Sequence, residues 1–384
     1  MTTRIGRNLF AQECQPDPPV SGTPKQLQLS AYASRKLRVI SFVAILLVVY
    51  LHAKRLSIGF ADVVVPMYPQ GINPNSLVQT LLSEVLGRIA VPIFFGISGL
   101  LFFRNIQFSA KAFLVKYRKR LYTLLVPYLV WSTWAVVLLF LLQSLPGSAL
   151  YFPTAQYIIR QYSPAQLLDA ITIHPIPFQL WFLQDLMIMV ALSPILYLLL
   201  TKLGVVSMGI FFLLWFFDVN IYIIRPGDDT LFFALGAFLA IRRIDINQRL
   251  RGQKVWMPLW FVLSCIETAA LLGGVRGVYP YLHKFNVLLG IFAVWCAYDA
   301  WIGAIPENHP LLKLASFTFF IFAAHEPALT MTLKLLFRVF GFSTAASLGI
   351  YLIAPVIVIS LATVAAYFLK NHVNWIYRLA TGGR

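Results

Sequence analysis

Long apolar blocks alternate with short polar segments along the chain. A helix needs about 20 mainly apolar residues to cross the roughly 30 Å hydrocarbon core of a bilayer. Ten blocks approach or reach that length, at residues 39–53, 77–103, 121–145, 178–200, 203–217, 230–241, 255–272, 285–304, 312–337 and 347–369. Because helices satisfy their own backbone amides in lipid, the pattern predicts an all-α polytopic integral membrane protein with about ten transmembrane helices. The fifth and sixth blocks are short and could instead form a re-entrant hairpin, which would leave the other eight unchanged.

Polar ends frame this apolar region. Residues 1–37 carry Pro, Gln, Ser and scattered charge without the apolar stretch of a signal peptide. We expect them to form a flexible, uncleaved cytoplasmic tail, residues 38–371 to form one transmembrane domain, and residues 372–384 to form a second cytoplasmic tail. The cysteines Cys14, Cys265 and Cys296 show no CxxC spacing or paired pattern, so neither a disulfide framework nor a metal site is expected.

Composition and charge agree with a membrane protein. The chain is 59% hydrophobic and 12% charged, whereas ordinary soluble domains are about 45–50% apolar and about 25% charged. The net charge of +17 could suggest nucleic-acid binding, but the basic residues lie between apolar blocks and form no soluble basic surface. With both termini cytoplasmic, most Lys and Arg residues fall on the cytoplasmic side, where they contact anionic lipid headgroups. The lipid bilayer, and not nucleic acid, is the expected partner.

Ionisable residues inside the apolar blocks carry the strongest functional signal, because each is costly to place in lipid. They are His52, Glu84, Arg88, Asp185, Glu267, Asp299, His325 and Glu326. At a rise of about 1.5 Å per residue, His52 and His325 each lie about 20 Å from the cytoplasmic start of their blocks. Glu84 and Asp185 lie about 10 Å below the outer face on the same count. The counts predict one polar layer in the outer half of the bilayer.

The acidic residues of the apolar blocks, and Arg88, allow structural as well as functional interpretations. Glu84 and Arg88 form an i,i+4 pair in the favourable order and could simply neutralise one another. Arg88 could equally hold an anionic group such as a phosphate or a thioester oxygen. Asp185 could make a helix-packing hydrogen bond, and a structural role is the more typical one for Glu267 and Asp299.

His52 is the strongest candidate for a chemical role. The positive charges of Lys54 and Arg55 beside it favour the neutral imidazole that a general base needs. His325 precedes Pro327, which removes a backbone hydrogen bond and kinks the helix, and it could be either a satisfied interhelical histidine or a catalytic one. The remaining histidines fall in loops or tails and are expected to be solvated: His174, His283, His309 and His372.

Five segments in order carry a resemblance to a known family: RVISFVAILLVVYLH at 38–52, RIAVPIFFGISG at 88–99, KRLYTLLVPY at 119–128, LWFL at 180–183 and SFTFFIFAAH at 316–325. Together they resemble the membrane-bound acyltransferase-3 family. The resemblance runs from Arg38 to the C-terminus and departs from the family in two places. Thirteen residues separate Arg38 from His52, where the family has ten and Ser41 stands at the expected place, and Thr123 replaces the family's second basic residue after Arg120.

The resemblance implies an O-acyltransferase, most often an O-acetyltransferase, of the cell inner membrane. Its donor would be acetyl-CoA or another acyl-CoA, used as a substrate with no bound cofactor, and its acceptor a hydroxyl of a cell-surface or lipid-linked saccharide. We expect His52 to be the general base or a transient acyl carrier and Arg88 to hold the oxyanion or a donor phosphate. The candidate catalytic residues are His52, Arg88, Glu84 and His325, and the candidate substrate-binding residues are Arg38, Lys119, Arg120, Trp181, Asp185 and Ser98.

The donor and acceptor are expected on opposite faces. The basic segment Lys111, Lys116, Arg118, Lys119 and Arg120 could bind the phosphates of acyl-CoA, or it could be an ordinary positive-inside anchor. The small residues Gly96 and Gly99, with the kink at Pro92, would leave room for a channel between the faces. Two other hypotheses remain: a transporter or flippase of a lipid-linked sugar that uses the same buried charges, and a non-catalytic membrane scaffold.

Overall fold

The computed structural model describes residues 29–55, 57–60, 63–66, 71–148, 151–152, 158–219, 227–246, 253–275, 277–303 and 305–383. The α-helices are α1 (Ala31–Ala53), α2 (Pro74–Gln79), α3 (Ala90–Phe103), α4 (Ala110–Arg120), α5 (Val126–Leu142), α6 (Pro164–Thr172), α7 (Trp181–Ala191), α8 (Ser193–Lys202), α9 (Val205–Phe216), α10 (Asp228–Ile241), α11 (Gln253–Leu272), α12 (Tyr279–Ala297), α13 (Pro310–Ala315), α14 (Thr318–Phe340), α15 (Thr344–His372) and α16 (Asn374–Thr381). Short π or 3₁₀ turns are η1 (Thr80–Val85), η2 (Leu86–Ile89), η3 (Leu121–Leu125), η5 (Ile159–Gln161), η6 (Phe178–Leu180) and η7 (Tyr298–Ile302).

All ten predicted apolar blocks contain helix, and the protein is a multi-pass membrane protein. In the described part, seven continuous helices are long and apolar enough to span a bilayer: Ala31–Ala53, Pro74–Phe103, Ala110–Leu142, Lys254–Leu272, Tyr279–Ile302, Thr318–Phe340 and Thr344–His372. An eighth span is possible if α7 and α8, which bend by 59° at their junction, are taken together. The predicted number of ten is not reached because α9 and α10 have only 12 and 14 residues.

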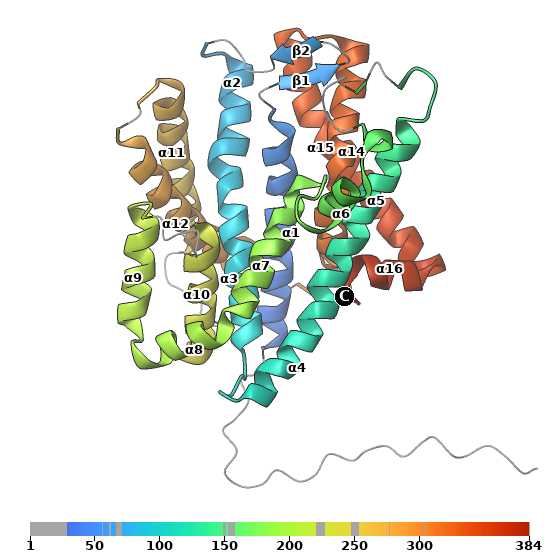
Figure 1. Cartoon of the computed structure of the whole chain (residues 1–384). Coiled ribbons are helices and arrows are strands. Elements are labelled where there is room, and N and C mark those ends of the chain that lie inside the picture. Colours follow the sequence, from blue (N-terminus) through green and yellow to red (C-terminus); the bar gives the residue numbers. More distant parts are fainter. Residues whose placement is uncertain are drawn as a thin grey trace, which may run out of the picture.

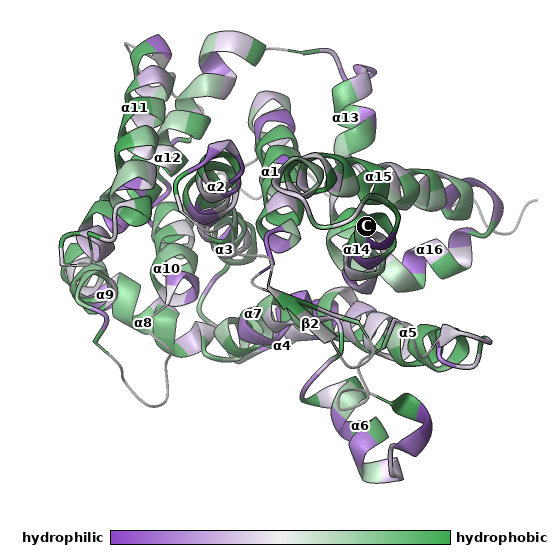
Figure 2. Ribbon diagram, turned by 90° about the horizontal axis from the view of Figure 1, so that it is seen from above, coloured by the Kyte–Doolittle hydropathy of each residue, from purple (hydrophilic) through white to green (hydrophobic). Residues whose placement is uncertain are grey.

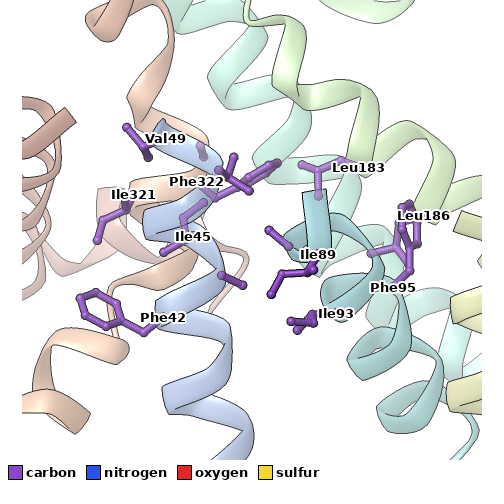
Figure 3. Packing of buried hydrophobic residues seen from close by; sticks show 14 of the residues in the cluster. Phe42, Ile45, Val49, Ile89, Ile93, Phe95, Leu183, Leu186, Ile321 and Phe322 are labelled. Atoms are coloured by element: carbon purple, nitrogen blue, oxygen red, sulfur yellow. The ribbon is translucent and has the colours of Figure 1, made fainter. Parts of the chain in front are cut away.

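Helix α1 lies in the interior of the bundle (Figures 1 and 2). It packs against α3 on one side and α14 and α15 on the other. Figure 3 shows Phe42, Ile45 and Val49 of α1 between Ile321 of α14 and Ile89 of η2. Apolar side chains therefore surround the helix that carries His52 along most of its length.

The first helix begins before the predicted domain boundary at residue 38. The hydroxyl of Ser30 accepts a hydrogen bond from the backbone N–H of Ala33 and caps α1. Lys36 is fully buried and pairs with Asp299 at 2.7 Å. Part of the predicted tail is thus the first turns of α1, while residues 1–28 lie outside the described residues.

A small β-hairpin interrupts the helical bundle between α1 and α2. Its strands are β1 (Ser57–Phe60) and β2 (Val63–Pro66), which pair antiparallel with Ser57 opposite Pro66. The hairpin lies at one end of the bundle, whereas α4 and α8 lie at the opposite end (Figure 1). Figure 2 shows the short helix α6 standing outside the long helices, with several hydrophilic positions. The hairpin end therefore carries the segments that extend beyond the bundle.

Helices α3 and α10 touch through their backbones. A Cβ atom added at Gly99 would lie 2.1 Å from the carbonyl oxygen of Phe233, and one at Gly236 would lie 2.0 Å from that of Gly96. Small residues permit this close approach of membrane helices. Although α10 is short, it is buried inside the bundle, as Leu231, Phe232 and Phe233 show.

Candidate active site

Two histidines from distant parts of the chain meet inside the bundle. The rings of His52, at the end of α1, and His325, in α14, stack with centroids 5.3 Å apart and planes 21° apart. The ring of Phe178 packs edge-on against His52 at 4.8 Å. The structure confirms the predicted common depth of the two histidines, although α14 begins at Thr318 and not at residue 312. Their chemical roles stay predictions.

The position of each nitrogen of His325 is well defined. Its ring is completely buried, and Nδ1 lies 3.3 Å from the carbonyl oxygen of Ile321. A carbonyl only accepts hydrogen bonds, so Nδ1 carries the proton and Nε2 presents a lone pair. Nε2 has no hydrogen-bond partner among the residues that the structure describes. In its neutral form His325 therefore keeps Nε2 as an acceptor nitrogen.

A buried ion pair lies directly beside the two histidines. Arg55 donates to the Glu326 carboxylate, and its guanidinium lies 5.2 Å from the centre of the Phe178 ring. The hydroxyl of Thr330 donates to the same carboxylate at 2.7 Å and accepts from Arg55 at 2.8 Å. Arg55 was predicted only as a charge that acts on His52. Its pairing with Glu326 was not predicted, because 271 residues separate the two.

Glu84 and Arg88 form the predicted i,i+4 ion pair on the other side of α1. The side chain of Arg88 is 46% exposed, and the ammonium of Lys54 lies 3.7 Å from Glu84. Both residues lie where the second span changes from the π turn η1 to the 3₁₀ turn η2. Such departures from α-helix often mark functional positions. Mutual neutralisation and a chemical role for Arg88 both remain compatible with this geometry.

A cavity of about 1090 Å³ opens beside the histidine pair, and we call it the outer cavity. Arg55, Glu326 and Phe178, the neighbours of the histidine pair, line this cavity together with residues of β1, η6, α6 and α14, whereas the two histidines themselves are not among its lining residues. Trp181, a predicted substrate-binding residue, lines it with 38% of its surface exposed. Asp169 of α6 lines it too and pairs with His174 at 3.0 Å. The outer cavity thus combines aromatic faces with polar groups.

A second cavity of about 570 Å³ lies between α1, α3, α10 and α12, and we call it the inner cavity. Its lining is mostly apolar and includes Ile93, Leu100 and Phe232, and the glycines Gly96 and Gly236 also line it. It reaches toward the start of α1 and the end of α10, on the side of the bundle where α4 lies.

The other predicted binding residues are not gathered around the histidines. Arg38 donates to the carbonyl of Leu312 at 2.9 Å and pairs with Glu307, so it anchors α1 to the segment around α13. Lys119 is exposed on α4, and the guanidinium of Arg120 lies 5.7 Å from the Phe102 ring. Ser98 is half-buried on α3, and the half-buried Asp185 of α7 interacts electrostatically with Asp229 of α10.

Several partners were not predicted from the sequence. Asp299 binds Lys36 at 2.7 Å and accepts from the hydroxyl of Tyr32 at 2.5 Å. Glu267 contacts His283 at 2.6 Å and accepts from Asn286 at 2.5 Å. His283 was predicted to be solvated, but it lies on α12 and packs against α11 through this contact. The apolar character of the blocks gave no signal for these pairs.

No cluster of His, Cys, Asp and Glu in the described part of the chain could hold a metal ion. The site offers histidine nitrogens and hydrogen-bonding groups near a cavity. A histidine with an open lone pair can take a proton from a hydroxyl, and nearby cations can stabilise negative charge that develops on an oxygen.

Comparison with known proteins agrees with this chemistry. The model of the acyltransferase domain of the acyltransferase-3 family matches residues 36–370. The chain is also 32% identical over 125 residues to the succinoglycan biosynthesis protein ExoH of Rhizobium meliloti (strain 1021), which covers 32% of this chain and 33% of that relative. No solved structure matches the chain. Since the family match extends from the buried turn at Lys36 to the end of α15 and includes both histidines, the chain belongs to the acyltransferase-3 family of membrane acyltransferases.

Proposed function

We propose that the protein is an O-acetyltransferase of the cell inner membrane, which moves the acetyl group of acetyl-CoA to a hydroxyl of a cell-surface or lipid-linked saccharide. The observation that carries the proposal is the stacked pair of the half-buried His52 and the buried His325, whose neighbours line the outer cavity. The neighbouring charged residues Arg55 and Glu326 are paired with each other, so the histidines are the best proton acceptors at this site.

The stacking favours a neutral pair. Two positive charges 5.3 Å apart would repel one another by about 3 kcal/mol at an effective dielectric constant of about 20. The pair therefore disfavours two positive charges at once, and at least one ring is neutral. That is the state a general base needs before it accepts the proton of a hydroxyl.

In the proposed reaction, His52 takes the proton of the acceptor hydroxyl while the hydroxyl oxygen attacks the carbonyl carbon of the thioester. The new C–O bond forms, the C–S bond breaks, and the departing CoA thiolate takes the proton from the imidazolium. Arg88 stabilises the oxyanion formed between these two events. A guanidinium has five N–H donors, so its bond to Glu84 leaves donors for a second anionic group.

The lining of the outer cavity supports a saccharide acceptor. Trp181 and Phe178 supply aromatic faces of the kind on which a sugar ring packs, and the Asp169 carboxylate can accept from sugar hydroxyls. The role of the relative ExoH in succinoglycan biosynthesis supports the same class of acceptor. We place the hairpin end of the bundle and the outer cavity on the periplasmic side.

The donor enters from the opposite, cytoplasmic side in this proposal. Helix α4 carries Lys111, Lys116, Arg118, Lys119 and Arg120, which can bind the phosphates of CoA. The inner cavity, open toward the same end of the bundle, offers an apolar passage for the pantetheine arm and its acyl group. Both chain termini then lie in the cytoplasm, in agreement with the positive-inside rule.

The proposal is tested with His52→Phe, a change that keeps an aromatic ring against Phe178 and removes both nitrogens. The matched control is His372→Phe, at the exposed end of α15. Cells that carry wild-type, His52→Phe or His372→Phe protein at equal levels are compared by mass spectrometry of their surface polysaccharide. We expect the mass of one acetyl ester per modified residue to disappear only with His52→Phe. Acetylation that persists at the wild-type level in this variant would refute the role of His52.

A separate experiment, which measures binding of the donor, distinguishes the acyltransferase hypothesis from the flippase hypothesis. Purified protein in detergent is heated with and without CoA, and the unfolding midpoint is measured. An acetyl-CoA-dependent enzyme is stabilised by CoA, by RT ln(1 + [L]/Kd) for a single site. The flippase hypothesis predicts movement of a lipid-linked sugar with no effect of CoA on the midpoint.

A further inference from the structure

Helix α14 is broken directly after His325. Glu326 has non-helical backbone angles, φ −112° and ψ 139°, and Pro327 follows it inside the helix. Proline has no N–H to donate, so the carbonyl of Ala323, four residues earlier, lacks its helical partner. In lipid an unsatisfied carbonyl costs several kcal/mol. Another group must therefore bind the backbone on either side of His325.

Gln179 supplies that group. Its side-chain NH₂ donates to the carbonyl oxygens of Ala323 at 3.3 Å and Glu326 at 3.4 Å. Gln179 belongs to η6, far from α14 in the sequence, and only 1% of its surface is exposed. The two bonded carbonyls flank His325 in the chain, so one amide spans the break.

The orientation of this amide follows from its partners. Two carbonyl oxygens face it, and only the NH₂ side of a glutamine amide can donate to them. Its oxygen Oε1 must then point away, and Oε1 has no hydrogen-bond partner among the described residues. Oε1 of Gln179 and Nε2 of His325 are thus two buried acceptors on neighbouring segments, both without donors.

The same short turn also contacts the other histidine. Phe178, the residue before Gln179, packs edge-on against His52. η6 therefore holds His52 with one side chain and the backbone around His325 with the next. The relative position of the two rings therefore depends on this turn as well as on the direct packing of α1 against α14.

We propose that Gln179 is the positioning residue of the histidine pair: its amide spans the break in α14 and fixes His325 so that its ring stacks on His52. This inference rests on the proposed function, because it assigns Gln179 to the site that performs acyl transfer. It adds a residue that acts through the histidines.

Two variants distinguish the effect of the hydrogen bonds of Gln179 from the effect of its side-chain volume. Gln179→Leu fills similar space without a donor, and Gln179→Glu places a second oxygen where the NH₂ group faces the two carbonyls. The matched control is Gln79→Leu. Gln79 is equally buried, but its amide bonds the side chains of Asn75 and Ser347 and not the α14 backbone.

Steady-state kinetics in proteoliposomes give the first readout. A catalytic group displaced by about 1 Å can cost about 100-fold in rate, and we expect kcat to fall by about this factor in both Gln179 variants. The KM for acetyl-CoA should change less than about twofold, because Gln179 does not line the inner cavity, where we propose that the donor binds. Gln79→Leu should retain its kcat. Wild-type kcat in both Gln179 variants, or an equal loss in Gln79→Leu, would overturn the proposal.

The second readout needs no turnover. The chain has six histidines, so ¹⁵N-histidine spectra of the purified protein can be assigned with a His325→Phe variant. We expect a single Nδ1–H form of His325 in the wild type and a mixture of tautomers in Gln179→Leu. Unchanged His325 signals alongside a general loss of thermal stability would show a merely structural role and overturn the inference. If the wild type transfers no acyl group but these signals change as expected, the proposed function fails while the positioning role stands.

Discussion

The ion pair between Lys36 and Asp299 holds the start of α1 against η7, and its contribution to stability can be measured. The ammonium nitrogen lies 2.7 Å from the carboxylate, and both side chains are 1% exposed. The hydroxyl of Tyr32 donates to the other carboxylate oxygen, and the ammonium lies 3.8 Å from the centre of the Trp295 ring. Every partner of the Asp299 charge is therefore supplied by the protein.

Replacing Lys36 with Met removes the charge and keeps the length of the side chain. A buried carboxylate that loses its cation typically destabilises a protein by about 3–5 kcal/mol. With an unfolding entropy of about 2.1 cal/mol/K per residue, 4 kcal/mol corresponds to a fall of about 5 °C in Tm for 384 residues. Replacing the whole pair, as in Lys36→Met with Asp299→Leu, should recover at least about 2 kcal/mol of this loss, because no lone charge then remains.

The assay is thermal unfolding in detergent, followed by the fluorescence of the nine tryptophans. Arg35→Met is the matched control on the same turn of α1. Its partner Glu307 is 61% exposed, and an exposed pair of this kind contributes at most about 1 kcal/mol. If Lys36→Met lowers Tm no more than Arg35→Met, or if the double variant is no more stable than the single one, the pair does not anchor α1.

Two further changes test the outer cavity and the helix packing. Trp181→Ala should raise the KM for the saccharide acceptor by up to about tenfold, since an aromatic contact contributes about 0.5–1.5 kcal/mol; an unchanged acceptor KM in steady-state kinetics would exclude stacking on Trp181. Gly236→Ala should cost about 1–3 kcal/mol, because the new Cβ would lie 2.0 Å from the carbonyl oxygen of Gly96. Thermal unfolding compares it with Gly209→Ala on α9, where the added Cβ meets nothing within 4 Å and no loss is expected.

The helices and the depth of the histidines could be predicted because both depend on local rules. Hydropathy marks a helix that crosses lipid, and the regular rise of a helix converts sequence distance into depth. Counting from residues 39 and 312 placed His52 and His325 in one layer, and their rings stack. The estimate for His325 held even though α13 and α14 are separate helices.

The partners of the buried charges could not be predicted, because they depend on contacts between distant segments. Lys36 and Asp299 are 263 residues apart, and a lysine near an apolar block is indistinguishable in sequence from one in a solvated tail. Because the sequence does not reveal this pairing, it predicts a tail for residues 31–37, which form the first turns of α1. Two features of the sequence could have indicated the role of Gln179. Its amide side chain directly precedes the LWFL segment, and Pro327 leaves a backbone carbonyl that needs another donor.

In the proposed reaction, the arrangement of charge favours the histidines over the carboxylates as proton acceptors. Glu84 is bound to Arg88, Glu326 to Arg55, and Asp299 to Lys36. Each carboxylate already accepts hydrogen bonds from a cation, so it is a poor acceptor for a further proton. Nε2 of His325 is buried without a donor in the described residues, and it retains the lone pair that a hydroxyl proton requires. In the proposed reaction, the ion pairs fix the helices that carry the two histidines.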